Sequence, residues 1–335
     1  MTIRIAVVGC GRVSARHFAS IVEPFELVAV CDIDSDALAV ATRDNAVPGY
    51  ASLESLLNEV QVDVVALATP TGLHSEQTVT CARHGVHVIT EKPMATRWSD
   101  AQRMVAECEQ RGTRLFVVKQ HRFSPVVRAL HNVVESGKMG RVYDVHLSVL
   151  WTRPQSYYDL AEWRGNYEMD GGALMNQAIH YIDLVRWIVG PVDSVHAYTA
   201  TLARRIEVED TAALSMKFRS GALGTVNVTM LTTPTNFEAS LTVVAEKGLV
   251  RLGGLACGRI EHWNVEGVAS PTVGEPSESL YGDGHRDFYR DVGVALTTGR
   301  PGLLEGAEGM KSLEIVVAAY RSAQEGRRMG LPIDW

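Results

Sequence analysis

The first 120 residues alternate short apolar runs with amphipathic stretches. Apolar runs bounded by turn residues predict strands at Ile3–Val8, Leu27–Cys31, Val62–Ala68, Val86–Thr90 and Leu115–Lys119. The amphipathic stretches predict helices at Ser14–Val22, Ser35–Asp44, 74–84 and 99–111. Strands that are apolar throughout are buried on both faces, and strands that alternate with helices form right-handed βαβ units. The pattern therefore predicts a doubly wound parallel sheet.

After residue 120 the chain changes to a period-two alternation, which is typical of strands with one solvated face. Longer strands are predicted within 141–152 and 192–247, with a hairpin turn at Ser220-Gly221. One helix is predicted at about 172–189, between the first two of these strands. Two more helices are predicted near 284–297 and 306–326.

These two patterns indicate two domains, and 335 residues exceed what one hydrophobic core usually supports. We expect an α/β Rossmann domain at residues 1–121. We expect an α+β domain with a large open, mainly antiparallel sheet at residues 122–335, whose late helices could pack back on the first domain. A broad open sheet with one uncovered apolar face is normally covered by another chain. The sequence therefore predicts a homodimer or homotetramer formed through this sheet.

The composition is that of an ordinary globular enzyme, with 46% hydrophobic and 21% charged residues. The net charge of −7 comes from interspersed acidic and basic residues, so no basic stripe is available for a nucleic-acid partner. No apolar run approaches the roughly 20 residues that cross a bilayer, and the N-terminal run is too short for a signal peptide, so we expect no membrane partner. The five cysteines are scattered and odd in number, which favours a reducing compartment. We therefore expect a cytoplasmic protein.

The first strand leads directly into Gly9-Cys10-Gly11, a turn of the dinucleotide-binding type. Such a turn needs glycine where the backbone bends and where it approaches the pyrophosphate, and Gly9 and Gly11 occupy these positions. Ser14 stands where the motif usually has its third glycine, which weakens the match.

The next strand leads to Asp32, 21 residues after Gly11. A carboxylate at this place accepts both ribose hydroxyls and repels a 2′-phosphate, which favours NAD over NADP. In the alternative interpretation the glycines only turn the chain and Asp32 caps the following helix, but Asp34 is better placed as that cap.

Two further strands end in Thr69-Pro70 and in Glu91-Lys92-Pro93. Strand ends of an open α/β sheet face the ligand crevice, so both segments should border the cofactor. Proline restricts the backbone of the residue before it, which helps to fix where the Lys92 amine points. Lys92 is a candidate to polarise or deprotonate a substrate hydroxyl, although a solvated, inert lysine is the commoner outcome at a loop start.

Together with Asn176-Gln177-Ala178-Ile179-His180, these motifs resemble those of the glucose-fructose oxidoreductase/inositol dehydrogenase/MocA family over essentially the whole chain. The resemblance implies a Rossmann domain followed by an α+β domain, with Glu91-Lys92-Pro93 between nicotinamide and substrate. It also implies that His180 accepts the hydroxyl proton while hydride leaves the same carbon, and that Lys92 stabilises the developing charge. Asn176 lies four residues before His180, so on a helix both side chains share one face. The alternative for His180 is a buried histidine without a chemical role.

The segment 151–183 resembles a narrower group, the UDP-N-acetylglucosaminuronate 3-dehydrogenases of the WlbA/WbpB type. Ser14, Trp163-Arg164-Gly165 and the segment 119–125 agree with this group. The resemblance implies oxidation of the 3-hydroxyl of UDP-N-acetylglucosaminuronate to a ketone, with hydride passing to NAD, in the biosynthesis of surface polysaccharide sugars. Some members of the group recycle bound NADH with 2-oxoglutarate, which is therefore a candidate second small-molecule partner.

The candidate site residues fall into three groups. Those assigned to NAD are Gly9, Gly11, Arg12, Val13, Asp32, Thr69, Pro70, His74, Glu91, Lys92, Gln120, Trp163 and Arg164. The nucleotide sugar carries a carboxylate and a pyrophosphate, which suit arginine. Its assigned residues are Lys92, Arg122, Arg153, Tyr157, Tyr158, Asn176 and His180. Catalysis is assigned to Lys92, Asn176 and His180, and no metal is expected because hydride transfer to NAD needs none.

Two other functions fit the same sequence. The first keeps the enzyme class and changes the substrate to another sugar, an inositol or a sugar acid. The second is a non-catalytic NAD-binding regulator, which the intact Lys92, Asn176 and His180 disfavour. His285, at the start of a predicted late helix, is either a cap-region histidine or one that returns to the active site.

Overall fold

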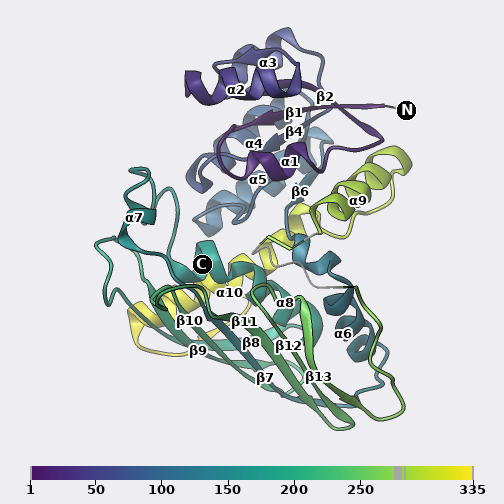
Figure 1. The fold of residues 1–335 in the computed structure, drawn as a ribbon, viewed down its shortest axis with the longest axis vertical. Coiled ribbons are helices and arrows are strands. Elements are labelled where there is room, and N and C mark those ends of the chain that lie inside the picture. The colour runs from purple at the N-terminus through teal and green to yellow at the C-terminus, as the bar shows by residue number, and fades with distance from the viewer. Residues whose placement is uncertain (1, 275–280, 283, 334–335) are drawn as a thin grey trace. The chain divides into compact units, whose positions relative to one another are not determined.

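The computed structural model describes residues 2–274, 281–282 and 284–333, and the chain forms two compact units (Figure 1). The two units comprise Met1–Lys119 with His285–Met310, and Gln120–Gly284 with Lys311–Trp335. The chain therefore leaves the first unit after Lys119 and returns to it at His285. Of the two late helices, α9 (His285–Thr298) belongs to the first unit, whereas α10 (Gly306–Glu325) begins there and continues into the second.

Within the described residues, the sheet of the first unit has six strands, all parallel, in the order β3-β2-β1-β4-β5-β6. These strands are β1 (Ile3–Val8), β2 (Phe25–Cys31), β3 (Gly49–Tyr50), β4 (Val64–Leu67), β5 (His87–Thr90) and β6 (Leu115–Val117). The strand order reverses between β1 and β4. In doubly wound sheets a ligand binds outside the carboxyl ends of the strands at such a switch point. The predicted Rossmann domain is confirmed.

The helices of the first unit follow the predicted alternation, and the structure adds the short helices η1 and α3. They are α1 (Ser14–Phe18), α2 (Ser35–Asn45), α3 (Leu53–Glu59), η1 (Thr71–Leu73), α4 (His74–Arg83), α5 (Trp98–Arg111) and α9. Asp34 accepts the N–H groups of Asp36 and Ala37 and so caps α2, as predicted. The sequence pattern does not predict β3 or α3, because a two-residue strand shows no alternation and α3 has only about two turns.

Within the described residues, the sheet of the second unit has eight strands in the order β13-β12-β11-β7-β10-β9-β8-β14. They are β7 (Val142–Leu150), β8 (Val192–Ala200), β9 (Thr211–Phe218), β10 (Leu223–Thr229), β11 (Glu238–Ala245), β12 (Gly248–Gly253), β13 (Arg259–Val265) and β14 (Met329–Gly330). Neighbouring strands are antiparallel except β7 and β10, which are parallel. Gly221 turns the β9–β10 hairpin with a φ of +89°, where the sequence predicts it. The mainly antiparallel sheet is confirmed.

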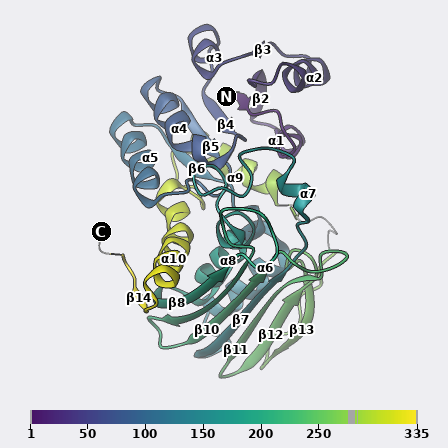
Figure 2. The same cartoon turned by 90° about the vertical axis from the view of Figure 1, so that its left-hand side faces the viewer.

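The helices of the second unit gather on one face of this sheet. They are η2 (Gln120–Phe123), α6 (Pro125–Glu135), α7 (Gln155–Tyr158), the π-helical turn η3 (Ala173–Ala178), α8 (Ile179–Val189) and α10. Figure 2 shows α6, α8 and α10 on one side of the strands and no helix of the described residues on the other side. One face of the sheet is therefore left uncovered by this chain.

The uncovered face mixes small, polar and apolar side chains. Along β9 and β10 exposed residues alternate with buried ones. Ala213, Ser215, Thr225 and Asn227 are exposed on this face, whereas apolar residues such as Val226 point into the core under the helices. Tyr198 and Leu223 are exposed on the same face, so the face that was expected to be apolar is of mixed character. The helices on the opposite face cover the buried apolar residues of β9 and β10.

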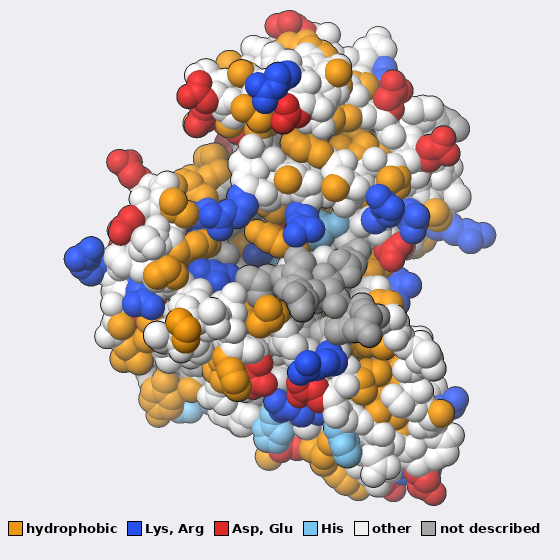
Figure 3. Space-filling model, in the orientation of Figure 1, with side chains coloured by type: hydrophobic (Ala, Val, Ile, Leu, Met, Phe, Trp, Pro, Cys, Tyr) orange, Lys and Arg blue, Asp and Glu red, His pale blue; other side chains and the backbone are white. Residues whose placement is uncertain are grey.

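The surface of the chain mixes charges of both signs. Figure 3 shows basic and acidic side chains interspersed over the face that it presents, in line with their mixing along the sequence. Of the helices in the described part of the chain, none has both the length and the hydrophobicity to cross a membrane.

Candidate active site

The turn after β1 needs its two glycines for different reasons. Gly9 has a φ of +94°, and a Cβ there would lie 2.7 Å from the Ala68 backbone, so a side chain does not fit. Apart from its two neighbours, none of the described residues has an atom within 4 Å of a Cβ placed on Gly11, so Gly11 leaves the surface of the turn clear. Ser14 is buried, and its hydroxyl donates to the Gly11 carbonyl at 2.7 Å. The serine that replaces the third glycine therefore braces the turn.

Asp32 holds its carboxylate beside this turn, directly after β2. One oxygen accepts the Cys10 N–H at 2.6 Å and the other accepts the Asp34 N–H at 2.8 Å. The residue is half-buried, and a carboxylate has further lone pairs for ribose hydroxyls. Arg12 is exposed in the same turn, and Val13 is the half-buried residue that precedes α1. A glycine surface without side chains and an oriented carboxylate fit the pyrophosphate and ribose of a dinucleotide.

His74 ties the ends of β4 and β5 together. It is 1% exposed, and its Nε2 and Nδ1 atoms each lie 2.9 Å from a carbonyl oxygen, of Thr69 and Pro93 respectively. Burial lowers the pKa of His74. The Thr69 hydroxyl donates to Gln77 at 2.6 Å, and Pro70 precedes the η1 turn. A neutral imidazole donates through one nitrogen only, so His74 donates to one of these two carbonyls and lies close to the other. Its direct contact with the cofactor stays a prediction.

Glu91 lies in the interior of the first unit and supports Lys92. Its carboxylate accepts from His17 Nε2 at 3.1 Å and from the Lys92 N–H at 3.1 Å, and His17 Nδ1 lies 2.6 Å from the Tyr289 hydroxyl. Burial alone would raise the pKa of Glu91, but the hydrogen bond from His17 and the electrostatic influence of His17, His285 and Lys92 lower it to about 2. Glu91 therefore links His17 to the backbone of Lys92, and its direct contact with the cofactor stays a prediction.

The helix that carries Asn176 and His180 begins with the π-helical turn η3 and continues as α8. The Asn176 amide donates to Asp170, whose other oxygen accepts the Gly165 N–H at 2.8 Å. Single π-helical turns are rare and occur often at functional sites. The prediction of one regular helix from 172 to 189 is wrong in its first turn.

The start of η3 is held by Glu209, a buried carboxyl group. It accepts the Leu174 N–H at 2.8 Å and the Tyr320 hydroxyl at 2.9 Å. Gly172 must lack a side chain, because a Cβ there would overlap the Glu209 carboxyl group. Burial raises the pKa of Glu209 to about 7.

His180 is buried beside a second histidine from η2. The His121 ring meets the His180 ring edge-on with centroids 4.8 Å apart, and it lies 5.3 Å from the Tyr181 ring. Further along α8, Asp183 accepts two hydrogen bonds from Arg122, at 2.6 and 2.7 Å. Arg122 is 1% exposed, so its expected substrate contact is corrected. Its guanidinium instead forms a buried ion pair that joins η2 to α8.

Arg153 and Arg164 both lie against the Tyr157 ring, with guanidinium carbons 5.2 and 4.5 Å from its centroid. Arg164 also donates to the Tyr157 hydroxyl at 2.7 Å and lies 4.3 Å from the Trp163 centroid. Tyr158 is buried edge-on to Tyr157 and supports it, in place of the expected substrate contact. The Nε atoms of both arginines are buried and have no hydrogen-bond partner among the described residues. Buried donors normally have partners, so this cluster fits an anionic ligand.

Gln120 stays a predicted cofactor residue. It is buried, and its Nε2 donates to the Tyr281 carbonyl at 3.1 Å. Its Oε1 has no hydrogen-bond partner among the described residues, so it can accept from a ligand.

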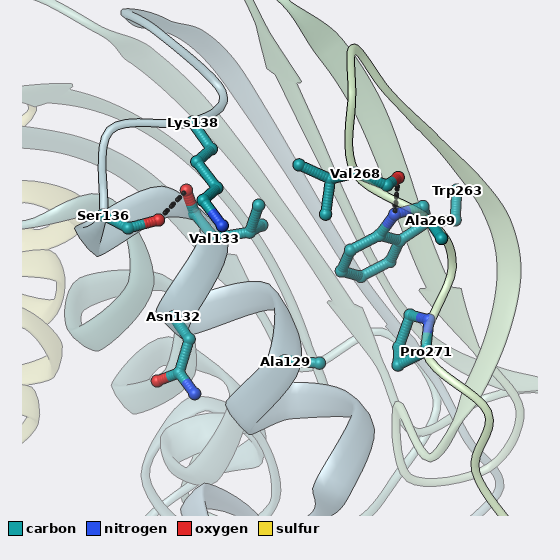
Figure 4. Close-up of a pocket in the computed structure, with 9 residues that line it drawn as sticks. All are labelled: Ala129, Asn132, Val133, Ser136, Lys138, Trp263, Val268, Ala269 and Pro271. Carbon is teal, nitrogen blue, oxygen red and sulfur yellow. Dashed lines mark hydrogen bonds between the residues drawn. The ribbon is translucent and has the colours of Figure 1, made fainter.

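An open groove of about 350 Å³ also lies in the second unit, between α6 and the segment after β13 (Figure 4). Its lining is mainly apolar. The Ser136 hydroxyl and the Trp263 N–H already donate to backbone carbonyls, each at 3.2 Å. None of the predicted site residues lines this groove, so we assign no chemistry to it.

Several residues of these networks are absent from the sequence prediction, among them His17, His121, Glu209, Tyr289 and Tyr320. His17 and Tyr289 lie 272 positions apart, so no local pattern joins them. A signal for His17 is its position three residues after Ser14, on the buried side of α1. His285 also lies in this cluster, 6.4 Å from the His17 ring, and burial lowers its pKa to about 4.

Two family models match the chain. Residues 3–119 match the oxidoreductase family with an NAD-binding Rossmann fold, and residues 127–251 match the GFO/IDH/MocA C-terminal domain. Each match falls within one of the two units.

Solved structures and curated proteins resemble the chain over its whole length. The WlbA dehydrogenase from Bordetella pertussis, solved with NADH and UDP-GlcNAcA, is 47% identical, with a TM-score of 0.93 and coverage of 100% of both chains. The WlbA dehydrogenase from Chromobacterium violaceum, solved with the same two ligands, is also 47% identical, with a TM-score of 0.93 and coverage of 100% of this chain and 97% of that one. D-apiose dehydrogenase from Paraburkholderia graminis is 27% identical over 97% of this chain and 89% of its own length.

Proposed function

Because this chain belongs to the GFO/IDH/MocA family of oxidoreductases, we propose that it is an NAD-dependent dehydrogenase that oxidises the 3-hydroxyl of UDP-N-acetylglucosaminuronate to a ketone. The observation that carries the choice of substrate is the full-length likeness to two dehydrogenases solved with NADH and this nucleotide sugar. The more distant D-apiose dehydrogenase supports oxidation of a sugar hydroxyl as the reaction class.

The first unit would hold NAD at the point where its strand order reverses. Gly11 leaves room for the pyrophosphate, and Asp32 would accept the ribose hydroxyls and disfavour a 2′-phosphate. Thr69 and Pro70 follow β4 at the same edge of the sheet. Bound NAD would supply the acceptor for the hydride that leaves the sugar.

Oxidation of a secondary alcohol requires that the hydroxyl lose its proton. His180 would accept this proton, since an imidazole titrates near neutral pH. The Lys92 ammonium would stabilise the charge that develops on the oxygen. Asn176, held by Asp170, would position a sugar hydroxyl.

The nucleotide sugar carries negative charge that the second unit is built to receive. Arg153 and Arg164 flank Tyr157 and keep buried Nε donors that no described residue satisfies. A carboxylate or phosphate oxygen would complete them, since charge-assisted hydrogen bonds are shorter and stronger than neutral ones. The proposal therefore places anion recognition at this cluster, with Arg153 and Tyr157 for the nucleotide sugar and Arg164, with Trp163 beside it, for NAD.

We also propose that the protein is a homodimer or homotetramer that pairs through the uncovered face of the eight-stranded sheet. Small side chains such as Ala213 and Ser215 let a second sheet approach closely, and Thr225 and Asn227 supply hydrogen bonds at such an interface. All five cysteines are free thiols, which supports a cytoplasmic setting.

The proposal is tested by following nicotinamide absorbance with purified protein, NAD and UDP-N-acetylglucosaminuronate, with and without 2-oxoglutarate. Lys92→Met and His180→Asn should each lower kcat by about 100-fold or more. The exposed Lys247→Met and His262→Asn are matched controls and should retain wild-type rates. Unchanged activity in both site variants, or faster turnover of myo-inositol or D-apiose than of the nucleotide sugar, would overturn the proposal. A rate that rises with 2-oxoglutarate would identify it as the second partner.

A further inference from the structure

We propose that His17 is a positioning residue for the dehydrogenase reaction, which acts on Lys92 through the buried carboxylate of Glu91. The inference rests on the proposed function, because it assumes that the Lys92 ammonium must be held in place for chemistry. His17 itself is 0% exposed, so it is placed to act through its neighbours.

The contacts form a continuous chain from three separate segments of the first unit. The Tyr289 hydroxyl from α9 lies 2.6 Å from His17 Nδ1, and His17 from α1 reaches Glu91 Oε1 through Nε2 at 3.1 Å. The other Glu91 oxygen accepts the Lys92 N–H at 3.1 Å. This series of contacts therefore joins α1, the helix after the glycine turn, to the loop after β5.

The direction of each hydrogen bond follows from the chemistry of the groups. An ionised carboxylate can only accept, so His17 Nε2 must carry the proton in its contact with Glu91. In the neutral imidazole Nδ1 is then an acceptor, and the Tyr289 hydroxyl donates to it. Tyr289 thus fixes the tautomer of His17, and His17 supplies the buried partner that an ionised Glu91 requires.

Lys92 is held on its other side by a second buried histidine. His74 Nδ1 lies 2.9 Å from the carbonyl oxygen of Pro93, and His74 Nε2 lies 2.9 Å from that of Thr69. The backbone of Lys92 is therefore fixed before and after its Cα, which leaves mainly the side-chain torsions to place the ammonium. Loss of the hydrogen bond from the Lys92 N–H to Glu91 would leave only the contact of His74 with the Pro93 carbonyl.

Two conservative substitutions at position 17 separate this role from a general packing role. Glutamine places its amide nitrogen near the position of histidine Nε2, so His17→Gln keeps the donor to Glu91. Asparagine places its amide near Nδ1, so His17→Asn keeps a partner for Tyr289 and loses the donor to Glu91. Both variants remove the ring, so a pure packing role predicts similar losses in the two.

The first measurement uses the protein without cofactor or substrate. Hydrogen exchange detected by mass spectrometry should show the Lys92 amide exchanging about tenfold faster in His17→Asn and near the wild-type rate in His17→Gln. The second measurement is steady-state kinetics with NAD and UDP-N-acetylglucosaminuronate. His17→Asn should lower kcat by about 30-fold with little change in KM, and His17→Gln should recover most of the loss.

The exposed His84→Asn is the control for replacing a histidine in this unit, and it should match the wild type in both measurements. Equal losses in His17→Gln and His17→Asn, or an unchanged Lys92 amide in His17→Asn, would overturn the proposal. If His17→Asn does not fold, Tyr289→Phe gives a second arm. It frees the imidazole tautomer and should speed exchange at Lys92 and lower kcat about threefold, and no change in either overturns the proposal.

The two proposals fail in different ways. Wild-type protein that does not turn over the nucleotide sugar would overturn the proposed function, whereas the exchange of the Lys92 amide would still report on His17 and Glu91.

Discussion

At the scale of single residues, Gly9 and Gly11 in the turn after β1 are glycines for two different physical reasons. Gly9 combines a left-handed φ with backbone atoms 2.7 Å from a Cβ position, so conformation and space both oppose a side chain. Gly11 meets neither obstacle within the chain. Its missing side chain matters only when a ligand lies on the turn, so the two requirements can be measured separately.

We expect Gly9→Ala to destabilise the protein by about 2 kcal/mol or more, because strain and overlap act together. Gly11→Ala should stay within about 1 kcal/mol of the wild type and lower the affinity for NAD by about tenfold or more. Chemical denaturation and calorimetric titration with NAD measure the two effects. Equal destabilisation in both variants, or unchanged NAD affinity in Gly11→Ala, would contradict this division.

The sequence predicts single residues well where the partner is close along the chain. Asp34 caps the helix that begins at the next residue, and Ser14 bonds to a carbonyl three residues earlier. Arg122 and His17 behave differently, since their carboxylate partners lie 61 and 74 positions away. Spacing rules describe local geometry only, so they assign Arg122 to a ligand and omit His17.

At the scale of elements, the helix that carries Asn176 and His180 depends on a carboxyl group that is protonated near neutral pH. Glu209 accepts the Leu174 N–H at the start of η3 and the Tyr320 hydroxyl. Burial raises its pKa to about 7, whereas the unfolded chain has the ordinary value of 4.5. The folded state therefore binds a proton that the unfolded state has already lost between these two pH values.

We expect the stability of the wild type to fall as pH rises from about 4.5 to about 7, by up to about 3 kcal/mol from Glu209 alone. The contribution is complete below pH 4.5 and lost above pH 7. Glu209→Gln keeps an uncharged acceptor for Leu174, so its stability relative to the wild type should rise across the same window. Urea denaturation at pH 5, 6, 7 and 8 measures this. The exposed Glu207→Gln is the control, and a parallel pH dependence of Glu209→Gln and wild type would refute the assignment.

Elements with several turns or a clear alternation are predictable from the sequence, and shorter or irregular ones are not. The strands β1, β2 and β4–β11 and the helices α2, α4, α5 and α8 follow their hydrophobic patterns, whereas β3, β12, β13 and β14 lie outside the predicted strands. The helices α3, α6 and α7 were not predicted, although α6 has about three turns and an apolar buried side. It also treats the π-helical turn as regular helix, because one extra residue in a turn leaves no mark on polarity. This omission matters, since the turn carries Asn176.

At the scale of the whole molecule, the sequence predicts the order of the two fold classes but not the path of the chain at its end. An amphipathic pattern shows that α9 has a buried side, but not which core that side meets. The structure places α9 in the first unit, where the Tyr289 ring packs edge-on against Phe25 at 5.6 Å. This return supplies the last member of the chain of contacts behind Lys92.

The uncovered face of the large sheet carries the last prediction, because a broad sheet with exposed strands on one side is normally covered by a partner. Light scattering should give the mass of a dimer or tetramer at micromolar concentration. Asn227 lies in the interior of this face, paired with Ala213 on β9 and Ser148 on β7. Asn227→Arg should shift the protein toward smaller species, since two copies of a buried charge would meet near the interface.

Asn58→Arg adds the same charge at an exposed position of α3 and should leave the mass unchanged. The two variants together distinguish pairing through this face from a general effect of charge. A monomeric wild-type protein would refute the proposed oligomer. An oligomer that survives Asn227→Arg would mean that the chain associates through a different surface.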